Sequence, residues 1–125
     1  MAQLFYHTTI RQRLRSIRRH GLCGGRHMNY SPSTYAHSRF AVYLFKQARS
    51  AMEWGWYNMR PGKPYARIHI IEVELPDNHP VGPDTHGDFL IAGKAVWTSW
   101  SIPPSAIRRV GELLDTRLEW EPSQN

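Results

Sequence analysis

The sequence predicts an α+β domain in which small mixed β-sheets pack on one or two helices. Its 125 residues are enough for one domain with a hydrophobic core and too few for two domains of ordinary size. Hydrophobic residues account for 41% of the chain and charged residues for 21%, which is typical of folded globular proteins. Strand and helix patterns alternate only at the start of the chain, and several strand patterns without intervening helices follow, which argues against a doubly wound parallel sheet. We therefore expect a single domain over residues 1–120 and a frayed tail over residues 121–125.

The first strand and the first helix are predicted by adjacent segments. Residues 4–9 form a mostly apolar run that carries His7 and two threonines toward a helix start, with Thr9 as the expected N-cap. Apolar residues then recur at helical spacing until Gly21 supplies a C′ residue. The apolar stripe consists of Ile10, Leu14 and Ile17, and the other face carries Arg11, Arg13, Arg15, Arg18 and Arg19. These arginines could hold phosphates, although a charge-rich helix face is more often simply solvated.

The remaining elements are predicted by shorter patterns. Residues 22–39 keep no period and carry many turn-forming residues, so we expect an irregular loop that faces a ligand. A second helix is expected over residues 46–57, and strands are expected over residues 40–45, 67–75, 88–92, 94–100 and 106–113. In the strand at 67–75 the alternation changes phase between Ile70 and Ile71, which indicates a β-bulge. Residues 102–105 indicate a tight turn or a single helical turn, and residues 112–120 a terminal strand or helix.

Charge and composition limit the partners and the compartment. A net charge of +6 and a pI near 9.9 indicate anionic partners such as nucleotides, nucleic acid or acidic protein surfaces, with solubility alone as the alternative. No apolar run reaches about 18 residues and no signal-peptide pattern opens the chain, so we expect a soluble cytoplasmic protein with no membrane partner. The single cysteine, Cys23, cannot form an internal disulfide. No paired-cysteine or His-Glu-x-x-His pattern predicts a metal site, and no glycine-rich phosphate loop is present.

The run Tyr6-His7-Thr8-Thr9, with the Ser-Ile pair and the Gly-Leu exit of the helix that follows, resembles the start of the ADP-ribosyltransferase-like superfamily. The likeness is to its histidine branch, which includes poly-ADP-ribose polymerases, DNA-directed toxins and RNA 2′-phosphotransferases. Thr8 stands where the family motif has glycine. The resemblance implies that His7 holds the adenosine-side ribose of NAD and that the backbone of Thr8 faces the nicotinamide carboxamide.

A second segment extends the resemblance. The run Ala-Val-Tyr-Leu-Phe at 41–45 is similar to the second motif of the family, whose tyrosine or histidine walls the nicotinamide pocket. The resemblance assigns that role to Tyr43 and gives Trp54, eleven residues later, the place of a second stacking aromatic. Aromatic faces hold a planar cationic ring well. Without the resemblance, both rings would be interpreted as core residues.

The third segment resembles RNA 2′-phosphotransferases. Residues 93–98 and the Ile-Pro-Pro run at 102–104 are similar to their third motif, and Arg39 matches an arginine that those enzymes place before the second motif. That branch has histidine at the position of Tyr43. The ADP-ribosylating branches place a glutamate near the third motif, but no carboxylate occurs from residue 89 to residue 111. Glu72 and Glu74 lie on the preceding strand, where we interpret them as solvent-facing.

Together these motifs imply a compact ADP-ribosyltransferase-like split mixed β-sheet and an NAD-dependent enzyme that transfers ADP-ribose to a macromolecular acceptor, nucleic acid or protein. NAD would be a substrate, and no metal is expected. The expected catalytic residues are His7, Tyr43 and Arg39; the expected NAD-binding residues are His7, Thr8, Thr9, Tyr43, Trp54, Val96 and Trp97; the expected acceptor-binding residues are Arg11, Arg15 and Arg18. Two alternatives remain open: an RNA 2′-phosphotransferase-like activity, and a binding module that kept the fold without catalysis.

Overall fold

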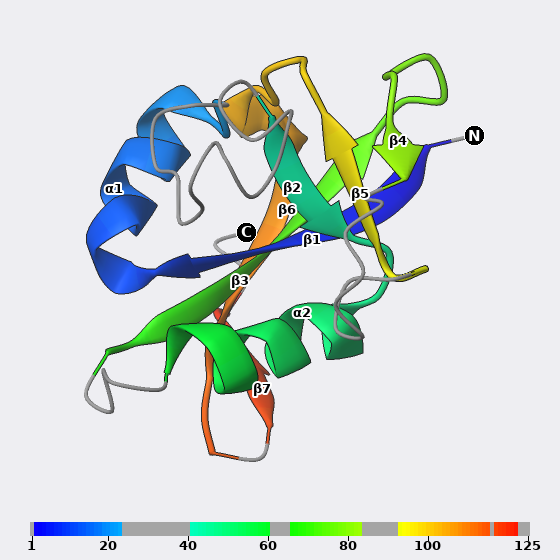
Figure 1. Ribbon diagram of the computed structural model, residues 1–125. Coiled ribbons are helices and arrows are strands. Elements are labelled where there is room, and N and C mark those ends of the chain that lie inside the picture. Colours follow the sequence, from blue (N-terminus) through cyan, green and yellow to red (C-terminus); the bar gives the residue numbers. More distant parts are fainter. Residues whose placement is uncertain (1, 24–40, 61–65, 84–92, 116, 123–125) are drawn as a thin grey trace.

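The computed structural model describes residues 2–23, 41–60, 66–83, 93–115 and 117–122. Within them the chain forms one seven-stranded sheet in the order β4-β5-β2-β1-β3-β6-β7 (Figure 1). The strands are β1 Gln3–Ile10, β2 Val42–Phe45, β3 Ile68–Leu75, β4 Gly82–Pro83, β5 Ala95–Thr98, β6 Ile107–Leu113 and β7 Leu118–Trp120. The helices are α1 Arg11–His20, α2 Ala48–Trp54, its π-helical continuation η2 Gly55–Met59 and the single turn η3 Pro104–Ala106. The predicted α+β class is confirmed, and every strand pairing among these residues is antiparallel, where a mixed sheet was expected.

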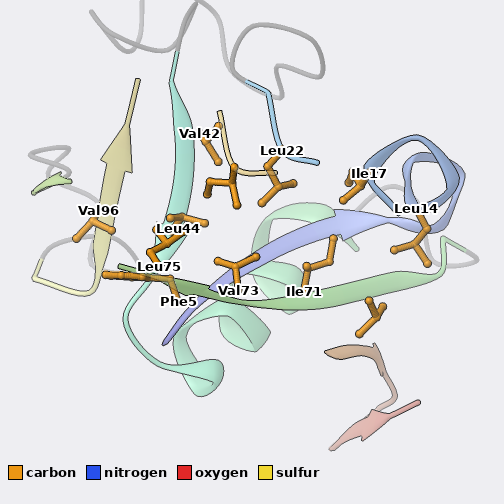
Figure 2. Packing of buried hydrophobic residues seen from close by; sticks show 12 residues of the cluster. Phe5, Leu14, Ile17, Leu22, Val42, Leu44, Ile71, Val73, Leu75 and Val96 are labelled. Carbon is orange, nitrogen blue, oxygen red and sulfur yellow. The ribbon is translucent and has the colours of Figure 1, made fainter. Parts of the chain in front are cut away.

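Each face of the sheet is covered by its own hydrophobic cluster. Figure 2 shows the first cluster, which joins the strands to α1 and which we call the α1-side cluster. Its members are Phe5, Leu14, Ile17, Leu22, Val42, Leu44, Ile71, Val73, Leu75, Val96, Ile102 and Val110. The second, the α2-side cluster, consists of Phe45, Ala51, Met52, Trp54, Ile68, Ile70, Ala95 and Leu113. Burial on both faces explains why several strands read as nearly continuous apolar runs.

The central strand β3 corrects the prediction of a bulge between Ile70 and Ile71. Its register with β1 is regular over the full length, from Gln3↔Leu75 to Ile10↔Ile68. The apolar phase changes because Ile70 belongs to the α2-side cluster and Ile71 to the α1-side cluster, so both faces need apolar residues. An irregularity does occur, but it lies in the pairing with β6, between Glu72 and Val73.

Helix α1 ends where the sequence predicts and begins differently. Gly21 follows it with φ +79°, and the Gly21 N–H donates to the Ile17 carbonyl at 2.7 Å. A Cβ at Gly21 would lie 1.9 Å from the Ile102 carbonyl oxygen, so this position requires glycine. The prediction of Thr9 as N-cap is wrong, because β1 continues through Ile10 and buries Thr9 in the sheet. The N–H of Arg11 instead donates to the Arg67 carbonyl at 2.9 Å.

Glu121, after β7, is also held against the sheet and α1. Glu121, which we expected to fray, donates its backbone N–H to the Val110 carbonyl at 2.8 Å and accepts both 2.7 Å hydrogen bonds from Arg18. The strand expected at 88–92 and most of the loop expected at 22–39 lie outside the described residues. Among the described helices none is long and apolar enough to cross a bilayer.

The imidazole of His69 is buried within the sheet. His69 lies on β3 between Thr9 of β1 and Glu112 of β6 and is 2% exposed, and neither ring nitrogen has a hydrogen-bond partner among the described residues. Burial lowers the pKa of His69; Arg11 and Arg67 lower it further, and Glu112 and Glu121 act in the opposite direction. The folded state therefore holds His69 neutral at pH values where the unfolded chain binds a proton.

This linkage predicts stability that depends on pH. The contribution of neutral His69 to the free energy of unfolding is complete above the pKa of the unfolded chain, about 6.5. It is lost as the pH falls from there toward the lower pKa of the folded state. Urea denaturation at a series of pH values should show stability rising with pH across this window. In a His69→Phe variant that part of the slope should disappear, whereas His20→Ala, at an exposed position, should keep it. An unchanged slope in His69→Phe would show that His69 is not the titrating group.

Candidate functional site

The two segments that carry the first and second motifs meet at a narrow junction. Within the described residues, one Cα pair, Tyr6↔Phe45, joins β1 to β2, although both strands have further residues beyond it. Figure 1 shows β2 ending at β1 at a steep angle, so β2 leads away from β1 on the side of Val42. The sheet thus stays connected between β1 and β2, but only through this one pair, and we call this place the β1–β2 junction. Where two strands separate in this way, their backbone N–H and C=O groups are not paired across a regular antiparallel ladder and need other partners.

His7 spans the β1–β2 junction. It is half-buried on β1, one residue beyond the Tyr6↔Phe45 pair, and its Nδ1 lies 2.8 Å from the carbonyl oxygen of Tyr43 on β2. A carbonyl oxygen only accepts hydrogen bonds, so Nδ1 carries the proton and donates. In the neutral ring Nε2 is then the nitrogen with the lone pair, able to accept a hydrogen bond from a hydroxyl. The contact fixes both the tautomer and the ring orientation.

Tyr43 and Trp97 form a cross-strand aromatic pair on the two strands next to β1. They are opposite residues in the β2–β5 register, and both are half-buried. Gly82 of the edge strand β4 lies opposite Trp97 on its other side, where a Cβ would come within 3.1 Å of the indole nitrogen. A glycine there lets the edge strand approach the indole closely. Three strands therefore fix the position of Trp97.

The face covered by α2 brings together several of the predicted residues. Tyr43 packs against the α2-side cluster, and Trp54 is a member of it. The hydroxyl of Thr8 donates a 2.8 Å hydrogen bond to the Ala51 carbonyl of α2, which ties β1 to this helix. Trp54 is only 6% exposed, and its ring lies 6.1 Å from that of Phe45 at a tilt of 43°. Trp54 thus has the environment of a core residue, and its contact with a ligand stays a prediction.

Other predicted residues lie apart from this group. Val96 belongs to the α1-side cluster, on the opposite face of β5 from Trp97. Thr9 shares a face of β1 with His7 and is fully buried, so its hydroxyl is not exposed for a ligand. Arg39 lies outside the described residues. The predicted NAD-binding set is therefore divided between two faces, and the hydrogen bond from His7 to the Tyr43 backbone connects them.

The interpretation of Glu72 as a solvent-facing carboxylate is wrong. Glu72 is buried and receives two hydrogen bonds from the Arg109 guanidinium, at 2.9 and 3.0 Å. Tyr6 lies directly opposite Glu72 on β1, and the Arg109 guanidinium lies 3.8 Å from the ring centroid of Trp120. Burial is the main cause that raises the pKa of Tyr6, and the hydrogen bond to Glu72 and the negative charge of Glu72 raise it further. A row of four side chains thus crosses the sheet from the β1–β2 junction to the edge strand β7.

Sequence reasoning missed this row although a signal was present. Glu72 follows three isoleucines and one histidine on a strand that is apolar on both faces. A carboxylate in such a strand requires a cation on a neighbouring strand. Arg108 and Arg109 are adjacent, which in a regular strand would send them to opposite faces. The irregular pairing at Glu72/Val73 lets Arg109 pair with Glu72 while Arg108 pairs with Glu74 at 2.7 Å.

The predicted acceptor-binding arginines lie along α1. Arg11, Arg15 and Arg18 are all exposed, and their spacing of four and three residues places them on one side of the helix. Arg18 forms a 2.7 Å ion pair with Glu121. Their role toward an acceptor stays a prediction.

Comparisons with known proteins support the fold and add no finer assignment. No protein-family model matches the sequence, and no curated protein matches it. A solved structure named EcPltA superposes with a TM-score of 0.65 over 97% of this chain and 83% of that chain, at 15% sequence identity. Identity this low supports a conclusion about fold alone. The chain therefore shares the α+β fold of EcPltA.

Proposed function

We propose that the protein binds NAD at the β1–β2 junction and transfers ADP-ribose to a macromolecular acceptor. The observation that carries the proposal is the hydrogen bond from His7 Nδ1 to the Tyr43 carbonyl, which joins the first and second motifs of the resemblance. The sequence resemblance puts the ribose-holding histidine and the nicotinamide-walling aromatic at these two positions. Membership of the ADP-ribosyltransferase-like superfamily is part of the proposal, and the fold shared with EcPltA is compatible with it.

In the proposed reaction, a nucleophilic atom of the acceptor attacks C1′ of the nicotinamide ribose. The bond between C1′ and the nicotinamide nitrogen breaks, the bonding electrons leave with neutral nicotinamide, and the acceptor atom loses a proton. His7 Nε2 would accept a hydrogen bond from a ribose hydroxyl and hold the adenosine side of NAD. The half-buried rings of Tyr43 and Trp97 would contact the flat nicotinamide. Catalysis would rest on orientation and on the electrostatics of the leaving group.

The His7→Ala variant tests the binding half of the proposal. It should weaken NAD binding by about 1–3 kcal/mol, or roughly 5- to 150-fold, because a ribose hydroxyl loses its partner. Calorimetric titration of NAD gives the affinity directly. His20→Ala, another histidine replaced at an exposed position, is the matched control and should bind NAD as the parent does. Equal affinity of His7→Ala and the parent would remove His7 from the site.

The chemical half is tested with labelled NAD. The protein is incubated with NAD labelled in its ADP-ribose part and with cell lysate, and the products are digested separately with nuclease and with protease. Label released only by nuclease indicates a nucleic-acid acceptor, and label released only by protease indicates a protein acceptor. Transfer of the phosphate of a supplied 2′-phosphorylated RNA onto the labelled ADP-ribose would indicate phosphotransfer instead. NAD binding with no transfer would support the binding module, since no carboxylate occurs from residue 89 to residue 111.

A further inference from the structure

An exposed tryptophan and a half-buried histidine form an aromatic pair at the β4 edge of the sheet. Trp100 is 55% exposed, and the ring of His79 lies 5.6 Å from it at an interplanar angle of 69°. The β4–β5 register pairs Gly82 with Trp97 and Pro83 with Val96, and its continuation places His79 opposite Trp100. The pair thus extends the sheet edge beyond the strands themselves. Single exposed hydrophobic residues are common on protein surfaces and need no explanation.

This pair differs from such residues because a buried hydroxyl holds both members. Thr98 is fully buried, its Oγ1 accepts the backbone N–H of Trp100 at 3.2 Å, and the same oxygen lies 3.1 Å from Nε2 of His79. The Thr98 hydroxyl can donate to Nε2 while it accepts from Trp100, so one side chain satisfies both contacts. Burial lowers the pKa of His79, which leaves its ring uncharged at neutral pH. A rigid aromatic face loses little conformational entropy when a ligand stacks on it.

The pair lies close to the basic end of α1. Ile102, two residues after Trp100 and therefore within about 7 Å of it along the chain, exchanges two 2.9 Å backbone hydrogen bonds with Leu22. Leu22 comes two residues after the end of α1 at His20, and the basic residues of the last turn of α1 are Arg18, Arg19 and His20. Within the described part of the chain, Arg15 and Arg19 form no ion pair, and both are exposed. Arg19 thus brings positive charge, uncompensated among the described residues, to the end of α1 that is bonded to the segment after Trp100.

We propose that Trp100 and His79 form a stacking platform for a base of single-stranded nucleic acid, whose phosphates follow the basic end of α1. Every base presents a π-face that can stack on an exposed indole, whereas a base inside a duplex is already covered. The arginines supply the attraction for phosphate that stacking lacks. As the acceptor site of the ADP-ribosyl transfer, this platform rests on the proposed function; as a binding surface it stands without it.

The test is fluorescence anisotropy with a labelled oligodeoxythymidylate of about 12 nucleotides, a length within the usual range of single-strand sites. NAD is left out, so a failure of the proposed function cannot alter the result. The parent should bind the single strand more tightly than a duplex of the same length. Trp100→Ala should weaken single-strand binding about 5- to 150-fold. Tyr57→Ala removes an even more exposed ring, at 62%, from another part of the surface and should leave binding unchanged.

Two further variants complete the test. Trp100→Phe keeps a stacking face and should recover most of the affinity that Trp100→Ala removes, which separates stacking from a change in folding. Replacing Arg15 and Arg19 together by glutamine should make the salt dependence of binding shallower, by about 0.7 for each phosphate that the protein no longer neutralises. The proposal is overturned if the parent does not bind the single strand, if Trp100→Ala binds as well as the parent, or if a polyglutamate peptide competes equally well.

Discussion

Replacing Trp54 by alanine is expected to lower the free energy of unfolding by about 3–5 kcal/mol, the usual range for truncating a large buried aromatic. Trp54 is a member of the α2-side cluster and lies at the end of α2, against Phe45 of β2. Its removal would leave a cavity between the helix and the strand that carries Tyr43. Urea denaturation of the variant and the parent measures the loss.

Trp100→Ala is the matched control, because it removes the same side chain from an exposed position and should change stability by less than about 0.5 kcal/mol. NAD titration of Trp54→Ala, expressed per folded molecule, then answers a second question. An affinity reduced about 5- to 30-fold would show that the ring also contacts the ligand, as the sequence resemblance implies. Unchanged affinity with a large loss of stability would assign Trp54 to the core alone. A stability equal to that of the parent would contradict the packing described above.

Arg109→Ala should produce the second large effect, a loss on the order of 2–4 kcal/mol in the free energy of unfolding. The variant leaves the buried Glu72 carboxylate without the guanidinium that donates two hydrogen bonds to it. Arg109 is itself half-exposed, so the loss should be smaller than for a fully buried pair. Chemical denaturation near neutral pH is the measurement, and the Glu72→Gln single and double variants complete a double-mutant cycle that isolates the pair.

The neighbouring ion pair supplies an internal control for this prediction. Arg108 also donates two hydrogen bonds to a carboxylate, at 3.1 and 2.7 Å, but both reach the same oxygen of Glu74, and both side chains of that pair are substantially exposed. Arg108→Ala should therefore cost no more than about 1 kcal/mol. Equal losses in the two arginine variants would mean that the burial of Glu72 does not determine the energetics of the row.

Local patterns predicted the elements whose stability comes from one regular face. The stripe of α1 and its glycine stop depend on spacing along a single helix, and they are confirmed in Leu14, Ile17 and Gly21, whereas Ile10 lies at the end of β1. The strand at 67–75 was also predicted, but its bulge was misplaced. The alternation of apolar and polar residues marks a strand with one solvent-exposed face, whereas both faces of β3 are covered. The Thr9 cap failed for a related reason: sheet pairing continues to Ile10 and outweighs a side-chain cap.

The geometry of the candidate site depends on pairings between distant segments, which no local pattern encodes. The sequence named His7 and Tyr43, but it could not show that His7 donates to the backbone of Tyr43 and not to its ring. It also could not show which of the adjacent residues Val96 and Trp97 shares a face with Tyr43 until the register of β5 against β2 was known. The partner of Glu72 was hidden because an irregular pairing sets which of two adjacent arginines reaches it.

The most direct test of NAD binding at the β1–β2 junction follows the tryptophan indole signals during an NAD titration. The chain has five tryptophans, which nuclear magnetic resonance can observe separately after isotope labelling and assignment by single replacement. Trp97 lies opposite Tyr43 beside the junction, whereas Trp120 lies on β7 at the far edge of the sheet, under Arg109. We predict that NAD shifts the Trp97 indole signal in a saturable manner and leaves that of Trp120 in place. Saturating NAD that moves only Trp120, or that moves no indole signal, would contradict binding at this junction.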